Sequence, residues 1–178
     1  MFDISHMGVL RLEGPKPKDA LQQLVPSDLH RIGPGEACYT VMLNASGGIL
    51  DDLIVYDLGA IDSQRGALVL VINAACAESD TAWIRERMEP AGLTVTDIKN
   101  AGVLLALQGP KAIGLVEQLS GSDLSGLPRF GHQDLTLDGL SHTVFTGRTG
   151  YTGEDGVELL LDAEAVSYTH LRAHETSL

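Results

Sequence analysis

The chain has 178 residues, 44% of them hydrophobic, which is enough to form one large domain or two small ones around buried cores. Its 24 acidic residues outnumber 12 basic ones, and the net charge of -12 opposes binding to nucleic acid and to anionic membrane surfaces. The longest apolar run, GALVLVINAACA, is interrupted by Asn73 and is too short to span a bilayer, so we expect neither a nucleic-acid partner nor a membrane segment.

The first half of the chain alternates between strand-like and helix-like apolar patterns. These patterns predict strands at residues 8–12, 37–43, 49–58 and 67–73, and helices at 15–25 and 78–89. Trp83, Ile84 and Met88 form one apolar stripe on the second helix. The NASGG stretch between the second and third strands combines Asn, Ser and paired glycines, which predicts a hairpin turn.

The second half continues with a strand at residues 103–107 and a helix that begins near Pro110 and ends at Gly121. Within LTLDGLSHTVF, Asp138 and Gly139 predict a two-residue hairpin turn, and residues 157–161 predict a last strand. This succession of strands with few helices predicts an α+β fold, in which antiparallel sheets carry helices on one face.

Two adjacent acids occupy the strand GGILDDLIVY. Because side chains alternate faces along a strand, Asp52 shares one face with Ile54 and Tyr56, whereas Asp51 faces the other way. One of the two acids therefore lies close to an apolar sheet face, where a carboxylate is disfavoured unless it is paired or functional. The pattern alone favours the other interpretation, in which both acids lie hydrated at the strand start beside the turn.

The stretch RTGYTGEDGVE places glycine at every third position, which indicates a loop bent through conformations that other residues avoid. It matches neither the dinucleotide-binding pattern nor an EF-hand loop. It could be a wide turn with solvated Glu154 and Asp155. Alternatively, Tyr151 offers a stacking face and Glu158 a carboxylate that can accept two parallel hydrogen bonds from a guanidine-like edge.

Histidines and cysteines give no metal or triad pattern. His6 lies at a strand start, but no other histidine stands at a metal-like spacing from it. Cys38 and Cys76 are far apart and form no CxxC motif, so free thiols are expected. We therefore assign no metal and no Ser-His-Asp triad.

The motifs FDISHMG, YTVMLNASGGILDDLIVY, VINA, LALQGP and GRTGYTGEDGVE together resemble, in this order, the glycine cleavage system T proteins, which are aminomethyltransferases. The resemblance extends from Met1 to about Val166. It implies a tetrahydrofolate-dependent transferase that takes the aminomethyl group from the dihydrolipoyl arm of H protein. The implied products are methylenetetrahydrofolate, ammonia and the reduced lipoyl protein.

The resemblance also assigns roles to individual residues. It implies that Tyr151 contacts the pterin ring of folate, that Glu158 binds the amino-pyrimidine edge, and that Asp52 is the acid beside the reacting nitrogens. The expected remaining pocket residues are Tyr39, Ile54, Tyr56 and Asn73.

The implied organisation is a T-protein-like folate-binding fold that is incomplete. Residues 1–10 and 98–166 would be parts of a discontinuous first folate-binding domain, residues 11–97 would form a second α+β domain, and the ending at 167–178 departs from the family and is expected to be a foreign or disordered tail. Family members begin earlier and continue further, so this chain has roughly half of their length. The expected location is the bacterial cytoplasm, with the mitochondrial matrix as the alternative.

Three other functions are compatible with parts of the pattern. One is a folate-binding module of the kind that assists iron-sulfur cluster assembly, although the KGCYxGQE-like motif of those relatives is absent. Another is the folate domain of a dimethylglycine or sarcosine dehydrogenase, although the sequence has no flavin fingerprint. The third is a non-catalytic structural fragment.

Overall fold

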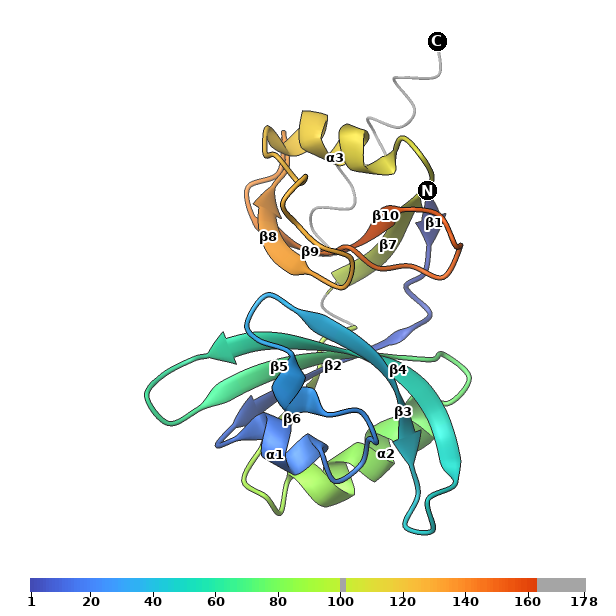
Figure 1. The fold of residues 1–178 in the computed structure, drawn as a ribbon, viewed down its shortest axis with the longest axis vertical. Helices are drawn as coiled ribbons and strands as arrows, with labels where there is room; N and C mark the ends of the chain where they lie inside the picture. The colour runs from blue at the N-terminus through green and yellow to red at the C-terminus, as the bar shows by residue number, and fades with distance from the viewer. Residues whose placement is uncertain (100–101, 163–178) are drawn as a thin grey trace. The chain divides into compact units, whose positions relative to one another are not determined.

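The chain forms two compact units, each built on a five-stranded antiparallel sheet (Figure 1). The computed structural model describes residues 1–99 and 102–162, and the expected tail at 167–178 lies outside them. The central unit is His6–Lys99. The split unit consists of Met1–Ser5 and, among the described residues after Lys99, residues 102–162.

The sheet of the central unit has the strand order β3-β4-β5-β2-β6. Its strands are β2 (Gly8–Gly14), β3 (Ala37–Leu43), β4 (Ile49–Ala60), β5 (Gly66–Ile72) and β6 (Thr94–Asp97). Helices α1 (Pro17–Leu21) and α2 (Ala77–Met88) lie on one face of this sheet (Figure 1), and a short 3-10 helix spans Leu29–Arg31. The core between sheet and helices includes Leu10, Leu53, Leu70, Ile84 and Met88, all almost fully buried.

The sheet of the split unit has the strand order β1-β7-β10-β9-β8. These strands are β1 (Phe2–Asp3), β7 (Gly102–Gln108), β8 (His132–Thr136), β9 (Thr143–Gly147) and β10 (Gly156–Asp162). Helix α3 (Ala112–Ser120) packs against this sheet through Val116, which joins Leu135, Val157 and Leu159 in a second core. Gly121 ends α3 in a left-handed conformation with φ 66°, as the sequence predicts.

The predicted fold class, α+β with antiparallel sheets and helices on one face, is confirmed. The NASGG hairpin is confirmed as well, because Asn44 N–H donates to the carbonyl of Gly48 at 2.8 Å and closes the turn between β3 and β4. Strands β1 and β6 were not predicted, because each is short and is fixed by pairing with a distant strand.

Two predicted elements are wrong in detail. The helix predicted at 15–25 ends at Leu21, because the Gln22 side chain bonds to the backbone of Val25, Ser27 and Leu29 and turns the chain. The predicted two-residue turn at Asp138 is a longer loop over residues 137–142. Its Asp138 N–H donates to the Leu119 carbonyl of α3 at 2.7 Å instead of closing a tight hairpin.

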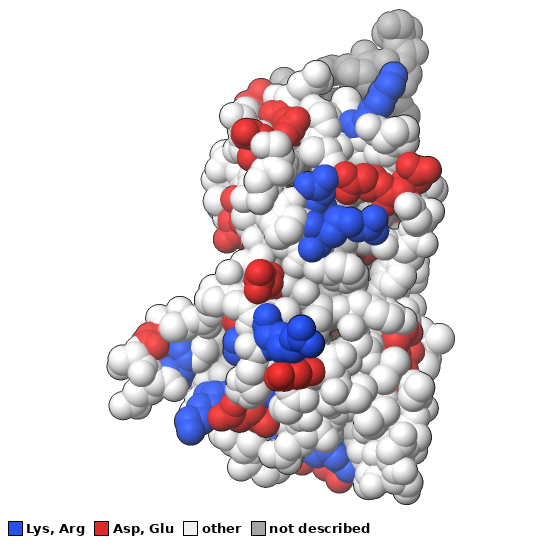
Figure 2. Space-filling view, viewed as in Figure 1, with Lys and Arg blue, Asp and Glu red and all other residues white. Residues whose placement is uncertain are grey.

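Charged side chains are distributed in both signs over the surface. On the face in Figure 2, small groups of basic side chains lie beside acidic ones. No helix within residues 1–99 and 102–162 is long and apolar enough to cross a membrane.

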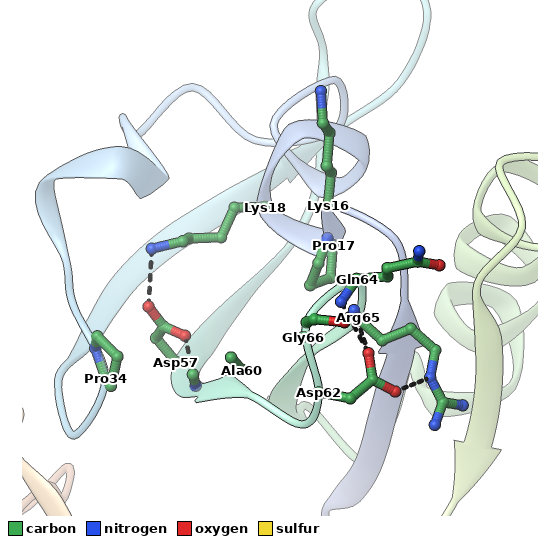
Figure 3. A pocket seen from close by; sticks show the side chains of 12 residues that line it. Lys16, Pro17, Lys18, Pro34, Asp57, Ala60, Asp62, Gln64, Arg65 and Gly66 are labelled. Carbon is green, nitrogen blue, oxygen red and sulfur yellow. Dashed lines mark hydrogen bonds and ion pairs between the residues drawn. The ribbon is translucent and has the colours of Figure 1, made fainter.

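A partly buried ion pair ties α1 to β4 in the central unit. Lys18 Nζ contacts Asp57 Oδ2 at 2.7 Å (Figure 3). It also donates to the carbonyl of Ile32 at 2.9 Å. The Asp57 side chain is only 5% exposed, and its Oδ1 accepts from the N–H of Gly59 at 2.8 Å. The ammonium thus compensates a carboxylate that has almost no access to water.

We expect Lys18→Met to lower the free energy of unfolding by about 3 kcal/mol, because removing one partner leaves the Asp57 charge buried without compensation. Urea denaturation measures the change. The control is Arg65→Met, which removes an exposed pair with Asp62 (Figure 3) and should cost less than about 1 kcal/mol. Equal losses of unfolding free energy in the two variants would contradict the claim that the burial of Asp57 makes its ion pair the stronger one.

Candidate functional site

Three neighbouring strands of the central unit bring Tyr39, Asp52 and Asn73 into direct contact. The hydroxyl of Tyr39 on β3 donates to Asp52 Oδ2 at 2.6 Å. The amide of Asn73, just after β5, donates to Asp52 Oδ1 at 2.6 Å. The Asp52 carboxylate on β4 thus has a donor on each oxygen, which fixes its orientation.

The alternation of faces along β4 is confirmed by its pairing with β3 and β5. Ile54 lies opposite Tyr39 and Val71, so it shares the Asp52 face, as does Tyr56. Leu53 belongs to the core beneath the helices on the other face. Ile54 and Tyr56 are 2% and 1% exposed, whereas Tyr39 is 49% exposed, so the Asp52 face carries both buried and accessible aromatic or apolar surface.

Asn73 links the two adjacent acids although they face opposite sides of the sheet. Its amide nitrogen lies 3.0 Å from Asp51 Oδ1 as well as 2.6 Å from Asp52 Oδ1. It can do so because Asn73 follows directly after the end of β5 at Ile72. Both acids are half-buried and hydrogen-bonded, so the interpretation as simply hydrated strand-end residues is wrong.

The acids shift the pKa of their neighbours. The hydrogen bond to Asp52 raises the pKa of Tyr39, and partial burial and the charges of Asp52 and Asp51 act in the same direction. The charge of Asp51 raises the pKa of the Cys76 thiol, together with burial and Asp80. Both the phenol and the thiol are therefore kept in their neutral forms at neutral pH.

A third acid on the helix side, Asp80 of α2, was missed by the sequence reasoning. It is 3% exposed, and burial together with contact to Asp51 raises its pKa to about 7. Burial opposes ionisation of Asp51 too, but hydrogen bonds from Asn73 and Asp80 leave its pKa lowered. A sequence signal existed, because positions 80, 84 and 88 have the four-residue spacing of one helix face.

The glycine-rich loop of the split unit is closed by a forked ion pair. Arg148 Nε and Nη2 contact the two oxygens of Asp155 at 3.1 and 2.6 Å, and Nη1 also donates to the carbonyl of Leu127. This pair lowers the pKa of Asp155. Asp155 is therefore a structural partner of Arg148, although its side chain remains 41% exposed, and Glu154 is exposed without such an ion pair among the described residues.

The two loop residues with expected folate roles differ in exposure. Tyr151 is 55% exposed on the loop. Glu158 lies on β10, is 3% exposed, and its Oε2 accepts a hydrogen bond from the Thr149 hydroxyl at 2.5 Å. The structure thus brings Tyr39, Asp52 and Asn73 together, with Ile54 and Tyr56 on the same sheet face, and it places Tyr151 and Glu158 in the other unit.

Gln108 explains two of the loop glycines. It donates from Nε2 to the carbonyls of Thr149 and Val157 at 2.9 and 3.3 Å. A methyl group on Gly150 would overlap its side chain, and one on Gly156 would overlap the Leu107 carbonyl oxygen. The glycines thus allow the close approach of β7 to the loop.

Other parts of the described chain are weaker candidates for a functional site. In residues 1–99 and 102–162, no three His, Cys, Asp or Glu side chains are grouped so that they could hold a metal ion, and His6 is exposed. A cavity of ≈ 350 Å³ beside α1 contains Lys18 and Arg65, but each is already paired with an acid (Figure 3). The Tyr39–Asp52–Asn73 cluster is therefore the candidate site.

Comparisons with known proteins agree on one family. The model of the GCVT N-terminal domain family matches residues 1–175. The aminomethyltransferase of Synechococcus sp. (strain CC9902) is 85% identical over 164 residues, which are 92% of this chain and 45% of the relative. The crystal structure of glycine cleavage system aminomethyltransferase T from Bartonella henselae matches 94% of this chain and 44% of its own, with 35% identity and a TM-score of 0.75.

A heterotetrameric sarcosine oxidase from Corynebacterium sp. U-96 also has a similar fold. Its TM-score is 0.63 over 94% of this chain and 77% of its own, but the identity of 16% shows the fold alone. The chain spans less than half the length of the aminomethyltransferases that it matches.

The loop geometry predicts unequal costs for two glycine substitutions. Gly156→Ala should lower the free energy of unfolding by about 3 kcal/mol, because the methyl group meets a backbone oxygen that cannot move aside. Gly153, with φ 78° and open space around it, should lose only about 1 kcal/mol on replacement by Ala, from backbone strain alone. Thermal and urea denaturation measure both; a larger loss at Gly153 would contradict the close approach of β7.

Proposed function

This chain belongs to the GCVT N-terminal domain family, and we propose that it is part of a tetrahydrofolate-dependent aminomethyltransferase of the glycine cleavage system. The whole enzyme moves the aminomethyl carbon from dihydrolipoyl H protein to tetrahydrofolate and releases ammonia. Its partners are then lipoylated H protein and the folate co-substrate, and its location is the bacterial cytoplasm. The high identity to a Synechococcus aminomethyltransferase supports this proposal.

The observation that carries the proposal is the Asp52 carboxylate, held by two neutral donors. Tyr39 and Asn73 orient it without neutralising its charge, and no Lys or Arg of the described residues is ion-paired with it. A fixed, ionised carboxylate stabilises positive charge that develops nearby. In the transfer, such charge develops as a folate ring nitrogen attacks the aminomethyl carbon and ammonia leaves.

Asp52 is therefore the catalytic residue of the proposed reaction. Tyr39 and Asn73 hold its orientation, and the 49% exposed ring of Tyr39 offers aromatic surface to the flat folate ring. Ile54 and Tyr56, at 2% and 1% exposure, are the proposed lining residues packed beneath the same sheet face. Preorganisation of this kind removes the need to reorient the carboxylate during the reaction.

Tyr151 and Glu158 are the proposed folate contacts from the split unit. The exposed ring of Tyr151 suits stacking on the pterin. A carboxylate such as Glu158 suits the adjacent N–H and amino donors of the pterin, because its two oxygens accept two parallel hydrogen bonds. We also propose the division of roles expected from the sequence, with 1–10 and 98–166 as a discontinuous folate-binding domain and 11–97 as a second domain.

No observation favours a second function. The likeness to sarcosine oxidase concerns the fold, and it carries no substrate to this chain. The identity of 35% to a glycine cleavage aminomethyltransferase of known structure, over 94% of this chain, favours the transferase over a folate domain attached to a dehydrogenase.

Asp52→Asn should lower kcat by about 100-fold in a full-length protein that contains this segment, because the amide keeps the shape but removes the stabilising charge. Ammonia release with lipoylated H protein measures the rate. Asp134→Asn, at an exposed position on β8, is the matched control and should keep normal activity. Full activity in Asp52→Asn would overturn the proposed role.

Glu158→Gln should weaken tetrahydrofolate binding by about 2–4 kcal/mol, or roughly 30- to 1000-fold, since one acceptor oxygen becomes a donor that faces a ligand donor. Calorimetry on this chain measures the affinity. Glu154→Gln changes an exposed acid of the same loop and should leave the affinity unchanged. The proposed contact fails if both variants bind folate equally well.

A further inference from the structure

Asp80 is a buried acid that the proposed reaction does not use. It lies on α2 at 3% exposure, on the same helix face as Ile84 and Met88. Ionised carboxylates are almost never buried to this degree without a cation or a full set of donors. Its burial therefore needs a chemical reason.

The reason lies in its contact with Asp51. The two side chains are within hydrogen-bonding reach of each other. Asp51 Oδ2 and Asp80 Oδ2 are both buried, and neither has a hydrogen-bond donor as a partner. Two ionised carboxylates only accept hydrogen bonds and repel each other, so the contact is favourable only when one of the two oxygens carries a proton.

The groups around the pair decide which acid keeps that proton. Asp51 receives a hydrogen bond from Asn73, which favours its ionised form. The other ionisable groups that act on the pair or on its hydrogen-bond partners are Asp52, Tyr39 and the neutral Cys76 thiol. No Lys or Arg of residues 1–99 and 102–162 forms an ion pair with Asp51 or Asp80, so the deeper acid is the one that stays protonated.

We propose that Asp80 is a positioning residue for Asp52: its neutral carboxyl donates a hydrogen bond to Asp51, which holds Asp51 against the Asn73 amide and so holds that amide on Asp52. The inference rests on the proposed catalytic role of Asp52. The hydrogen-bond directions are consistent along the chain of contacts. Asp80 donates to Asp51, Asn73 donates to both Asp51 and Asp52, and Tyr39 donates to Asp52.

The protonation state of Asp80 makes this arrangement sensitive to pH. Burial first, then the contact with Asp51, raises the pKa of Asp80 from 3.8 to about 7. In the unfolded chain this acid ionises near 3.8, while the folded protein keeps its proton. The folded state therefore binds more protons between these values, and stability falls as pH rises from about 4 to about 7. Above about pH 7, both the Asp51 and the Asp80 carboxylates are ionised and repel each other next to Asn73.

The decisive variant is Asp80→Asn, because an amide has the shape of the neutral acid and still donates to Asp51, but cannot ionise. Asp80→Ala removes the donor and leaves a cavity. In a full-length protein, we expect the kcat of the unmodified protein to decline as pH rises through about 7. We expect Asp80→Asn to keep normal kcat at pH 6 and not to show this decline. We expect Asp80→Ala to lower kcat by about 10- to 100-fold at all pH values.

A second measurement does not depend on activity. Urea denaturation of this chain and of Asp80→Asn should show that the unmodified chain loses stability relative to the variant as pH rises from about 4 to about 7, because the variant lacks the contribution of Asp80 to the proton-binding difference between the folded and unfolded states. If Asp80→Ala does not fold, Asp80→Asn alone tests the proposal.

The outcomes separate this inference from the proposed function. Loss of activity in Asp52→Asn, together with a pH profile of Asp80→Asn identical to that of the unmodified protein, would overturn the role of Asp80 and leave the function standing. A kcat of Asp80→Asn as low as that of Asp80→Ala would also overturn the role of Asp80, because a neutral hydrogen-bond donor at this position would then not be sufficient to hold Asp51. Normal activity in Asp52→Asn would remove the proposed function itself.

Discussion

The pleat of β4 is the constraint on which the candidate site depends. Asp51 and Asp52 are adjacent in sequence, so they must face opposite sides of a sheet whose helices lie on one side only. One acid is thereby directed toward α2 and the other toward the face opposite the helices. Asn73 lies directly after the end of β5, and from there its amide reaches both carboxylates.

The sequence predicts those parts of the site that depend on local rules. A period of two residues is sufficient to assign Asp52, Ile54 and Tyr56 to one face. The contact of Tyr39 with Asp52 could not be predicted in this way, because the β3–β4 register shifts between Met42 and Leu43, next to the NASGG turn. Asp80 was missed because its partner, Asp51, lies on another element and meets it only when α2 packs on the sheet. The same limit applies to Lys18 and Asp57, whose ion pair joins a short helix to a strand far along the chain.

The backbone conformation of the glycine-rich loop likewise depends partly on the local sequence and partly on residues far along the chain. Its glycine spacing indicates an unusual backbone, and the structure confirms positive φ at Gly150 and Gly153. The cause lies partly outside the loop, since Gln108 of β7 occupies the space that a side chain at Gly150 would need. The sequence alone likewise could not distinguish the two acids before Gly156: Glu154 is exposed, whereas Asp155 closes the loop through Arg148.

Three acids within one small cluster would be an electrostatic burden in a chain of net charge -12 if all were ionised. Differences in burial among the three carboxyl groups reduce this repulsion. Asp80, the most buried, has its pKa raised to about 7, while Asp51 has donors that lower its own pKa. With Asp80 neutral, the charges of the cluster are confined to the two acids of β4, and the half-buried Asp52 alone directs its charge to the face opposite the helices. Differences in burial over one strand and one helix turn thus give chemically identical side chains separate roles.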